Sequence, residues 1–196
     1  MKYLNIKQFD VANGPGMRTS LFVTGCRHKC PGCFNLIAQN FEIGEEFTDE
    51  TIDFLIESIR PEYMDGLTLL GGEPMDPLNQ PSIHKLIMRV REEFGDSKTI
   101  WSWTGYVYPR DFERDSNKAR AYTEYTDDIL NNLDVLVDGP FIQSLKSAKL
   151  QFRGSANQEI IDMRKSRETG TKVVIQMDDD PNLVKEIYEN SKKAKI

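Results

Sequence analysis

Apolar side chains along the chain fall into two alternating patterns, short runs and helix-spaced stripes. Short runs rich in β-branched and aromatic residues are typical of strands, and stripes with a period of three or four residues are typical of helices. The strand candidates are residues 19–25, 67–70, 99–104, 135–137 and 172–176. The helix candidates are residues 48–60, 82–94, 123–131 and 181–190. Thr48 provides a cap for the first helix, Pro61 ends it, and Pro181 suits the first turn of the last one.

Strands that alternate with helices imply βα units and a mainly parallel sheet. About five such units are too few for a complete eight-stranded barrel. We therefore predict the α/β class, with an incomplete TIM-like parallel β/α barrel. The length of 196 residues indicates one domain, 1–196, with a core of about 5–176 and a terminal helix and polar tail at 181–196.

Four of the predicted strands run into loops that carry glycine. These loops contain Gly25, Gly71 with Gly72, Gly105 and Gly139. In parallel α/β folds, ligands bind at the carboxyl ends of the strands. The sequence therefore predicts that the four loops line one rim.

Charge and hydropathy exclude several classes of function. Twenty-five basic residues stand against 31 acidic residues, which gives a net charge of −6. Binding to nucleic acid needs a clustered basic excess, which argues against a general polyanion binder. No apolar run approaches the roughly 18 residues that span a bilayer, and the first residues lack a signal-peptide hydrophobic region. We expect a soluble cytoplasmic protein that contacts neither membrane nor nucleic acid.

All three cysteines, Cys26, Cys30 and Cys33, fall within eight residues. Clustered cysteines in a reducing compartment indicate metal or redox chemistry rather than disulfides. A cubane iron–sulfur cluster normally takes four cysteines, so three would leave one iron open, which is typical of a catalytic centre. The alternatives are a structural zinc site completed by His28 and, less in keeping with the clustering, three unrelated thiols.

The spacing C-x3-C-x2-C is the signature of the radical S-adenosylmethionine enzymes. The segment 13–18 (NGPGMR), followed by Thr24-Gly25-Cys26, resembles the glycyl-radical-enzyme activases. Further motifs of that kind are residues 71–74 (GGEP), 101–106 (WSWTGY), 138–141 (DGPF) and 153–158 (RGSANQ).

From about residue 5 to 162, the chain resembles the family of activating proteins for anaerobic ribonucleoside-triphosphate reductase. Glu159 departs from that pattern, in which a basic or apolar residue is common at this position. We assign no function to the residues after Gly170.

The resemblance implies a 4Fe-4S cluster held by Cys26, Cys30 and Cys33, with S-adenosylmethionine bound at the open iron. The implied cofactor-binding residues are Gly32, Cys33, Phe34, Gly71, Gly72, Glu73, Thr104, Asp138 and Arg153. Among them, Glu73 and its glycines would hold the methionine ammonium, and Gly32 to Phe34 the nucleoside end. No catalytic residue is implied beyond the cluster and S-adenosylmethionine.

Several of these residues also have a purely structural interpretation. Thr104 and Asp138 suit turns at strand ends, and Asp138 could instead receive a glycine loop of the partner. Arg153 could pair with the methionine carboxylate or with an acid of the partner. The sequence does not decide the role of Arg18 either. Trp101 and Trp103 fit a core better than a cofactor contact.

Two further features have simple structural interpretations. We expect His84 to pack on a helix surface, and residues 178–180 (DDD) to form a solvated turn.

The implied reaction is that of a radical S-adenosylmethionine oxidoreductase. One electron, from a donor such as a flavodoxin, cleaves S-adenosylmethionine to methionine and a 5′-deoxyadenosyl radical. That radical takes a hydrogen atom from a glycine of the reductase large subunit and leaves a glycyl radical. A homodimer or a complex with the reductase is also expected. The alternatives are another radical S-adenosylmethionine enzyme, with a different glycyl-radical partner or a small-molecule substrate, and a non-catalytic zinc-stabilised binding module.

Overall fold

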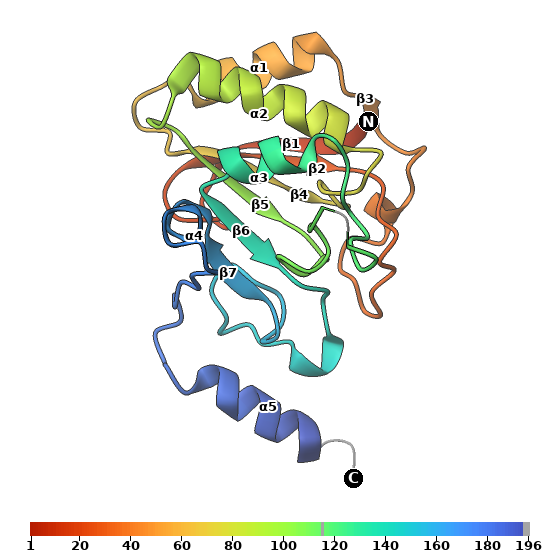
Figure 1. The fold of residues 1–196 in the computed structure, drawn as a ribbon, viewed down its shortest axis with the longest axis vertical. Coiled ribbons are helices and arrows are strands. Elements are labelled where there is room, and N and C mark those ends of the chain that lie inside the picture. Colours follow the sequence, from red (N-terminus) through yellow and green to blue (C-terminus); the bar gives the residue numbers. More distant parts are fainter. Residues whose placement is uncertain (115, 194–196) are drawn as a thin grey trace.

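The computed structural model describes residues 1–114 and 116–193, which form one seven-stranded sheet with helices packed on it (Figure 1). The strands are β1 (Lys2–Asp10), β2 (Arg18–Val23), β3 (Glu45–Glu46), β4 (Gly66–Gly71), β5 (Thr99–Trp103), β6 (Val135–Asp138) and β7 (Glu159–Asp162). The helices are α1 (Asp49–Ile59), α2 (Gln80–Phe94), α3 (Thr126–Asn132), α4 (Met163–Thr169) and α5 (Leu183–Lys193), with the 3-10 turns η1 (Ile37–Gln39) and η2 (Gln143–Leu145). The end of the expected polar tail, 194–196, lies outside the described residues.

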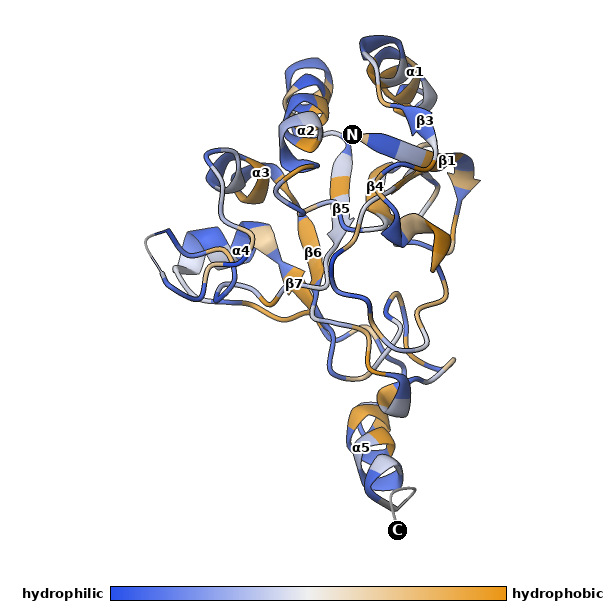
Figure 2. Cartoon of the chain, turned by 90° about the vertical axis from the view of Figure 1, so that its right-hand side faces the viewer, coloured by the Kyte–Doolittle hydropathy of each residue, from blue (hydrophilic) through white to orange (hydrophobic). Residues whose placement is uncertain are grey.

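The strand order is β3-β1-β2-β4-β5-β6-β7. The four central strands β2, β4, β5 and β6 are parallel, whereas β1 and β7 pair antiparallel at the two sides. Helices α1 to α4 follow one another along one face of the sheet (Figure 2), and α5 lies apart near the C-terminus (Figure 1). The predicted α/β class is confirmed; the sheet is parallel in its middle, as expected, and mixed as a whole.

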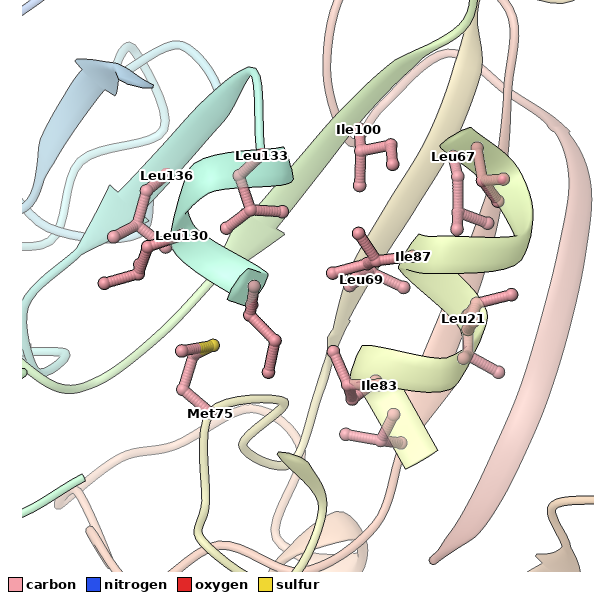
Figure 3. Close-up of a cluster of buried hydrophobic side chains, with 14 of the residues drawn as sticks. Leu21, Leu67, Leu69, Met75, Ile83, Ile87, Ile100, Leu130, Leu133 and Leu136 are labelled. Carbon is pink, nitrogen blue, oxygen red and sulfur yellow. The ribbon is translucent and has the colours of Figure 1, made fainter. Parts of the chain in front are cut away.

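The main core lies between the parallel strands and the helices. Leu67 and Leu69 of β4 point to the same face because side chains alternate along a strand. They meet Ile83 and Ile87 of α2 in the cluster that Figure 3 shows. Each such side chain, fully buried, stabilises the fold by roughly 1.5–3 kcal/mol. The helical stripes read from the sequence are therefore the faces that hold α1 and α2 on the sheet.

Helix α1 begins where the sequence predicts. The Thr48 hydroxyl accepts a hydrogen bond from the Thr51 amide, and the Thr51 hydroxyl accepts one from the Thr48 amide. This capping box satisfies backbone donors that the first turn of a helix leaves free. His84 also lies as expected, on the surface of α2, with Nε2 3.2 Å from Asp128 Oδ2.

The buried side chain of Arg18 lies at the amino ends of the central strands. Its guanidinium donates to Thr68 Oγ1, to the Leu67 carbonyl and to both oxygens of Thr99, at 2.8–2.9 Å. The ring of Trp101 lies 5.7 Å away, and burial lowers the pKa of Arg18 to about 10. Arg18 is thus a structural residue at the amino ends of the central strands, opposite the ends that carry the glycine-bearing loops.

Three sequence expectations need correction. Residues 172–176 are no strand, because they contribute a single bridge, between Val174 and Ile161 of β7. The edge strands β1, β3 and β7 and the short helix α4 were not expected. The last helix begins at Leu183, two residues after Pro181. No helix in the described part of the chain is long and apolar enough to cross a membrane.

Candidate functional site

A cavity of about 370 Å³ opens at the carboxyl ends of the parallel strands. The loops that follow β2, β4, β5 and β6 all contribute to its wall, through Cys26, Gly72, Thr104 and Gly139 respectively. The predicted common rim is therefore confirmed. The wall includes these candidate site residues: Cys26, Cys30, Cys33, Phe34, Gly71, Gly72, Glu73, Thr104 and Arg153.

The three cysteines line this cavity as free thiols. Burial raises the pKa of Cys26 to about 12 and also raises the pKa of Cys30. A metal bound there would have to displace the thiol protons, because the thiolate is the metal ligand.

The cysteine geometry bears on the choice between zinc and a cluster. Within the described residues, no three His, Cys, Asp or Glu side chains are gathered closely enough to hold one ion. A single zinc ion needs its ligands about 2.0–2.3 Å from one centre, whereas a cubane binds each thiolate to a different iron and spreads the sulfurs apart. Nε2 of His28 is engaged by Glu73, so a zinc ligand from this ring would be Nδ1. The described residues, as they lie, thus form no closed site for a single ion.

Glu73 is buried and joins three segments of the cavity wall. Its Oε2 accepts a hydrogen bond from the Gly105 amide at 2.7 Å and lies 2.9 Å from His28 Nε2. Its Oε1 accepts from the Met75 amide at 2.9 Å. The imidazole of His28 also packs edge-on against Tyr106, with ring centroids 4.4 Å apart. One carboxylate thus fixes the cysteine loop, its own loop and the loop after β5 relative to one another.

Backbone contacts tie the same two loops together directly. The Gly72 amide donates to Val23, and the Glu73 amide donates to the Gly25 carbonyl, at 2.7 and 2.8 Å. A Cβ atom on Gly72 would lie 2.7 Å from the carbonyl oxygens of Gly25 and Ala38. Only glycine permits so close an approach of two backbones.

An ion pair between half-exposed Arg27 and buried Asp76 makes a further link from the cysteine loop. Arg27 donates to both carboxylate oxygens of Asp76 at 2.8 Å, and its guanidinium lies 5.1 Å from the Phe41 ring centre. Burial raises the pKa of Asp76. The positive charge beside the cysteines is therefore partly balanced by a buried acid, in addition to Glu73.

Thr104 and Phe34 lie at the cavity in different ways. Thr104 is buried, and its hydroxyl accepts from the Tyr106 amide at 3.1 Å, which is the turn chemistry expected for it. Phe34 is 86% exposed at the mouth. Trp101 packs in the core beside Trp103, and Trp103 reaches the cavity wall.

Gly32 and Asp138 are not among the described residues that line the cavity. Gly32 packs beside Gln143, whose side chain would overlap a Cβ at that position. Asp138 shares its face of β6 with Leu136, and its Oδ2 accepts from the Tyr108 amide at 2.8 Å. Burial raises the pKa of Asp138 to about 6. In this structure Asp138 therefore supports the loop after β5.

Arg153 lines the cavity from the loop between η2 and β7, and its side chain is 4% exposed. One terminal nitrogen donates to Asp178, whereas its Nε has no hydrogen-bond partner among the described residues. A buried donor without a partner is costly, so this nitrogen is a candidate contact for an anionic ligand. Asp178 itself is buried, which corrects the expectation of a solvated turn at residues 178–180.

Sequence reasoning did not find two supports of the site. The first is the contact between His28 and Glu73, which no short-range spacing reveals because the two lie 45 positions apart. The second is Asp10, whose carboxylate accepts from the Ala12 amide and the Asn13 side chain and so shapes the turn that lines the cavity. Burial opposes ionisation of Asp10, but these and further hydrogen bonds outweigh it and lower its pKa to about 2.

Residues 12–161 match the family described as 4Fe-4S single cluster domain. Proteins named anaerobic ribonucleoside-triphosphate reductase-activating protein are similar over most of their length. Those of Salmonella typhi and Escherichia coli are each 38% identical over 166 residues, which covers 84% of this chain and 100% of theirs. That of Vibrio cholerae is 41% identical over 162 residues, which covers 82% of this chain and 97% of its own.

Proposed function

From the premise that the chain belongs to the family of anaerobic ribonucleoside-triphosphate reductase-activating proteins, with a 4Fe-4S single cluster domain, we propose that it is a radical S-adenosylmethionine enzyme. Its substrate is a glycine of the large subunit of the anaerobic reductase, on which it generates a glycyl radical. The observation that carries this proposal is that one cavity is lined by three thiols, a glycine–glutamate loop and a buried arginine.

The residues of the cavity fit both groups. Cys26, Cys30 and Cys33 hold the 4Fe-4S cluster, and no other cysteine of the chain is available as a fourth ligand. The unpartnered Nε of Arg153 and the carboxylate of Glu73, both in the cavity wall with the thiols, fit a small zwitterion that carries one carboxylate and one ammonium group. When bound, the cluster and S-adenosylmethionine supply the electron transfer and carbon–sulfur bond cleavage that remove a hydrogen atom from glycine.

The chain itself binds, orients and shields. Glu73 orients the loop that meets the methionine ammonium and keeps lone pairs for it, since each carboxylate oxygen accepts more than one hydrogen bond. Arg153 pairs with the methionine carboxylate. Cys33 and Phe34 meet the nucleoside end, with Gly32 in the turn between Cys30 and Cys33. Thr104 lines the far side of the site, and Asp138 supports that side through the Tyr108 amide. On this proposal, the open sheet is the partial barrel of the radical S-adenosylmethionine fold.

A polypeptide substrate suits the mouth of this cavity. Phe34, Leu36 and Ile37 follow the last cysteine and are 86%, 65% and 63% exposed. Exposed apolar side chains grouped in one segment mark a surface that a protein partner covers. The glycine loop of the reductase enters here, and a reduced carrier such as a flavodoxin delivers the electron. The proposal leaves room for a homodimer or a complex with the reductase.

The proposal is tested on full-length protein reconstituted anaerobically with iron and sulfide. Iron, sulfide and zinc are measured first. The protein is then reduced with dithionite or flavodoxin and given S-adenosylmethionine, and 5′-deoxyadenosine is assayed by chromatography. In a third step the anaerobic reductase is added and a glycyl radical is sought by electron paramagnetic resonance. Alanine variants of Cys26, Cys30 and Cys33 are compared with Ser97→Ala, an exposed position far from the cavity.

We expect about four iron atoms per chain, 5′-deoxyadenosine and a glycyl radical in the wild type and Ser97→Ala, and none of these signals in the cysteine variants. One zinc without iron or sulfide would identify a zinc-stabilised module instead. Release of 5′-deoxyadenosine without a radical on active reductase would identify a radical enzyme with another substrate. A Cys30→Ala variant that still activates the reductase would exclude the cluster.

A further inference from the structure

A segment beyond the family region reaches back to the wall of the cavity. The match to the 4Fe-4S single cluster domain ends at residue 161. Residues 171–193 then follow, run beside β7 and end in α5 (Figure 1). The Asp162 amide donates to the Val173 carbonyl, and the Ile175 amide donates to the Ile160 carbonyl, at 2.9 and 2.7 Å. The segment is therefore attached to the sheet before it turns toward the cavity.

Asp178 makes the polar contact between this segment and the cavity wall. Its side chain is fully buried and pairs with Arg153. Its Oδ1 accepts from the Gln151 amide at 3.0 Å, and its Oδ2 lies 3.3 Å from the Gln176 side-chain nitrogen. Asp178 thus binds both the backbone and the guanidinium of the loop that presents Arg153.

Helix α5 makes the apolar contact. Leu183, Val184 and Ile187 pack on a small cluster beside η2, which consists of Leu145, Leu150 and Ala156. Leu150 is itself a wall residue of the cavity. The segment therefore holds the wall at two of its residues, Leu150 by packing and Arg153 by charge.

We propose that Asp178 is a positioning residue for ligand binding: it holds Arg153 at the cavity so that the free Nε donor meets a carboxylate group. This inference rests on the proposed function and assigns the carboxylate to the methionine end of S-adenosylmethionine. The segment 171–193 is accordingly a part of the binding site that the 4Fe-4S domain does not contain.

The physical reason lies in the donors of the guanidinium. Arginine carries five N–H groups in a fixed planar fork, so one guanidinium can bind two carboxylates at once. A buried guanidinium without a counter-charge is strongly unfavourable. If Asp178 is removed, we expect the Arg153 side chain to leave the wall for solvent and to take the Nε donor with it.

The test measures binding rather than turnover. Full-length, cluster-loaded Asp178→Ala and Asp178→Asn proteins are titrated anaerobically with S-adenosylmethionine and with its decarboxylated analogue, in a calorimeter or by equilibrium dialysis. Asp179→Ala is the matched control, because it removes the same charge one residue away, at an exposed contact with the Gln151 side chain. Iron and sulfide contents are measured on every sample.

We expect Asp178→Ala to weaken S-adenosylmethionine binding about tenfold, equivalent to about 1.4 kcal/mol, and to weaken binding of the decarboxylated analogue less than about threefold. Asp178→Asn, which keeps an acceptor for the Gln151 amide, is expected to fall between wild type and Asp178→Ala for S-adenosylmethionine. Asp179→Ala should bind as the wild type does.

Three results would overturn the inference. Unchanged or tighter binding to Asp178→Ala and Asp178→Asn would exclude positioning, and tighter binding would show that Asp178 competes with the ligand. Equal weakening for both ligands would indicate a general loosening of the wall. Wild-type protein that holds a full cluster but does not bind S-adenosylmethionine would overturn the proposed function, and the inference with it.

Discussion

Glu73 allows a quantitative test of how the cavity is held together. The Glu73→Gln variant keeps the shape of the side chain but replaces one acceptor oxygen with an NH2 group. In the wild type, both oxygens accept from backbone amides, that of buried Met75 and that of partly buried Gly105. In either orientation of the glutamine side chain, its NH2 group therefore faces a backbone N–H group, that of Gly105 or that of Met75.

The cost follows from these contacts. An unsatisfied buried N–H group costs about 1–3 kcal/mol, and a hydrogen bond to a charged acceptor is about 1 kcal/mol stronger than one to a neutral acceptor. Two contacts lose that charge, the one to the remaining amide and the one to His28. The amide is easier to bury than a carboxylate, which offsets part of the loss. We expect a net loss of about 2–4 kcal/mol in the free energy of unfolding.

The measurement is urea unfolding of the cluster-free protein at pH 7, followed by circular dichroism and by the fluorescence of the two tryptophans. Glu92→Gln on the exposed face of α2 is the control and is expected to change stability by less than about 0.5 kcal/mol. A Glu73→Gln protein within about 1 kcal/mol of the wild type at an unchanged urea slope would refute the argument that this carboxylate joins the loops.

Three further predictions concern residues outside the ligand contacts. The Arg18→Lys variant loses some of the four hydrogen bonds of the guanidinium, so its free energy of unfolding in urea should fall by about 2–4 kcal/mol. A loss below about 1 kcal/mol would contradict the structural role of Arg18. Because burial raises the pKa of Asp138 to about 6, the folded state holds its proton more tightly, so the contribution of Asp138 to stability is full below about pH 4 and falls as the pH rises through 6. Asp138→Asn should therefore gain on the order of 2 kcal/mol relative to wild type between pH 4 and pH 7 in urea titrations, whereas a constant difference would contradict the burial. Lys98→Met removes the buried donor to the Pro61 and Met64 carbonyls and should lower Tm by about 3–10 °C in calorimetry, whereas an unchanged Tm would show that these carbonyls find other donors.

The central part of the fold could be predicted because its patterns are strong and local. The apolar positions at helical spacing in α1 and α2 form the buried faces of these helices, and the parallel strands end at the glycine-bearing loops. The edges could not be predicted in the same way. Strand β1 is half-exposed and has no clean alternation, and α4 has only seven residues. The apolar run 172–176 resembles a strand but lies where the sheet offers it a single bridge.

The candidate site likewise has residues that the sequence predicts and residues that it does not. Residues at the carboxyl ends of strands, such as Cys26, Glu73 and Thr104, were found because parallel topology brings such ends together. Asp138 was placed with them, yet the alternation of side chains along β6 turns it to the other face. The pairing of Asp178 with Arg153 joins positions 25 residues apart, and local composition instead indicated a solvated turn.

The separation between the hydrophobic core and the cysteine loop determines what happens to the folded protein when it loses its iron. The buried cluster around α1, α2 and α3 contains none of the three cysteines, and the loops of the cavity are tied by backbone hydrogen bonds and by Glu73. Small domains whose fold depends on a metal unfold when it is removed. Because the main core and these ties do not use the thiols, we expect a molecule that has lost its iron to remain folded and able to take up a new cluster. Inactivation by loss of iron is then reversible, and reactivation requires new iron and sulfide but no newly synthesised protein.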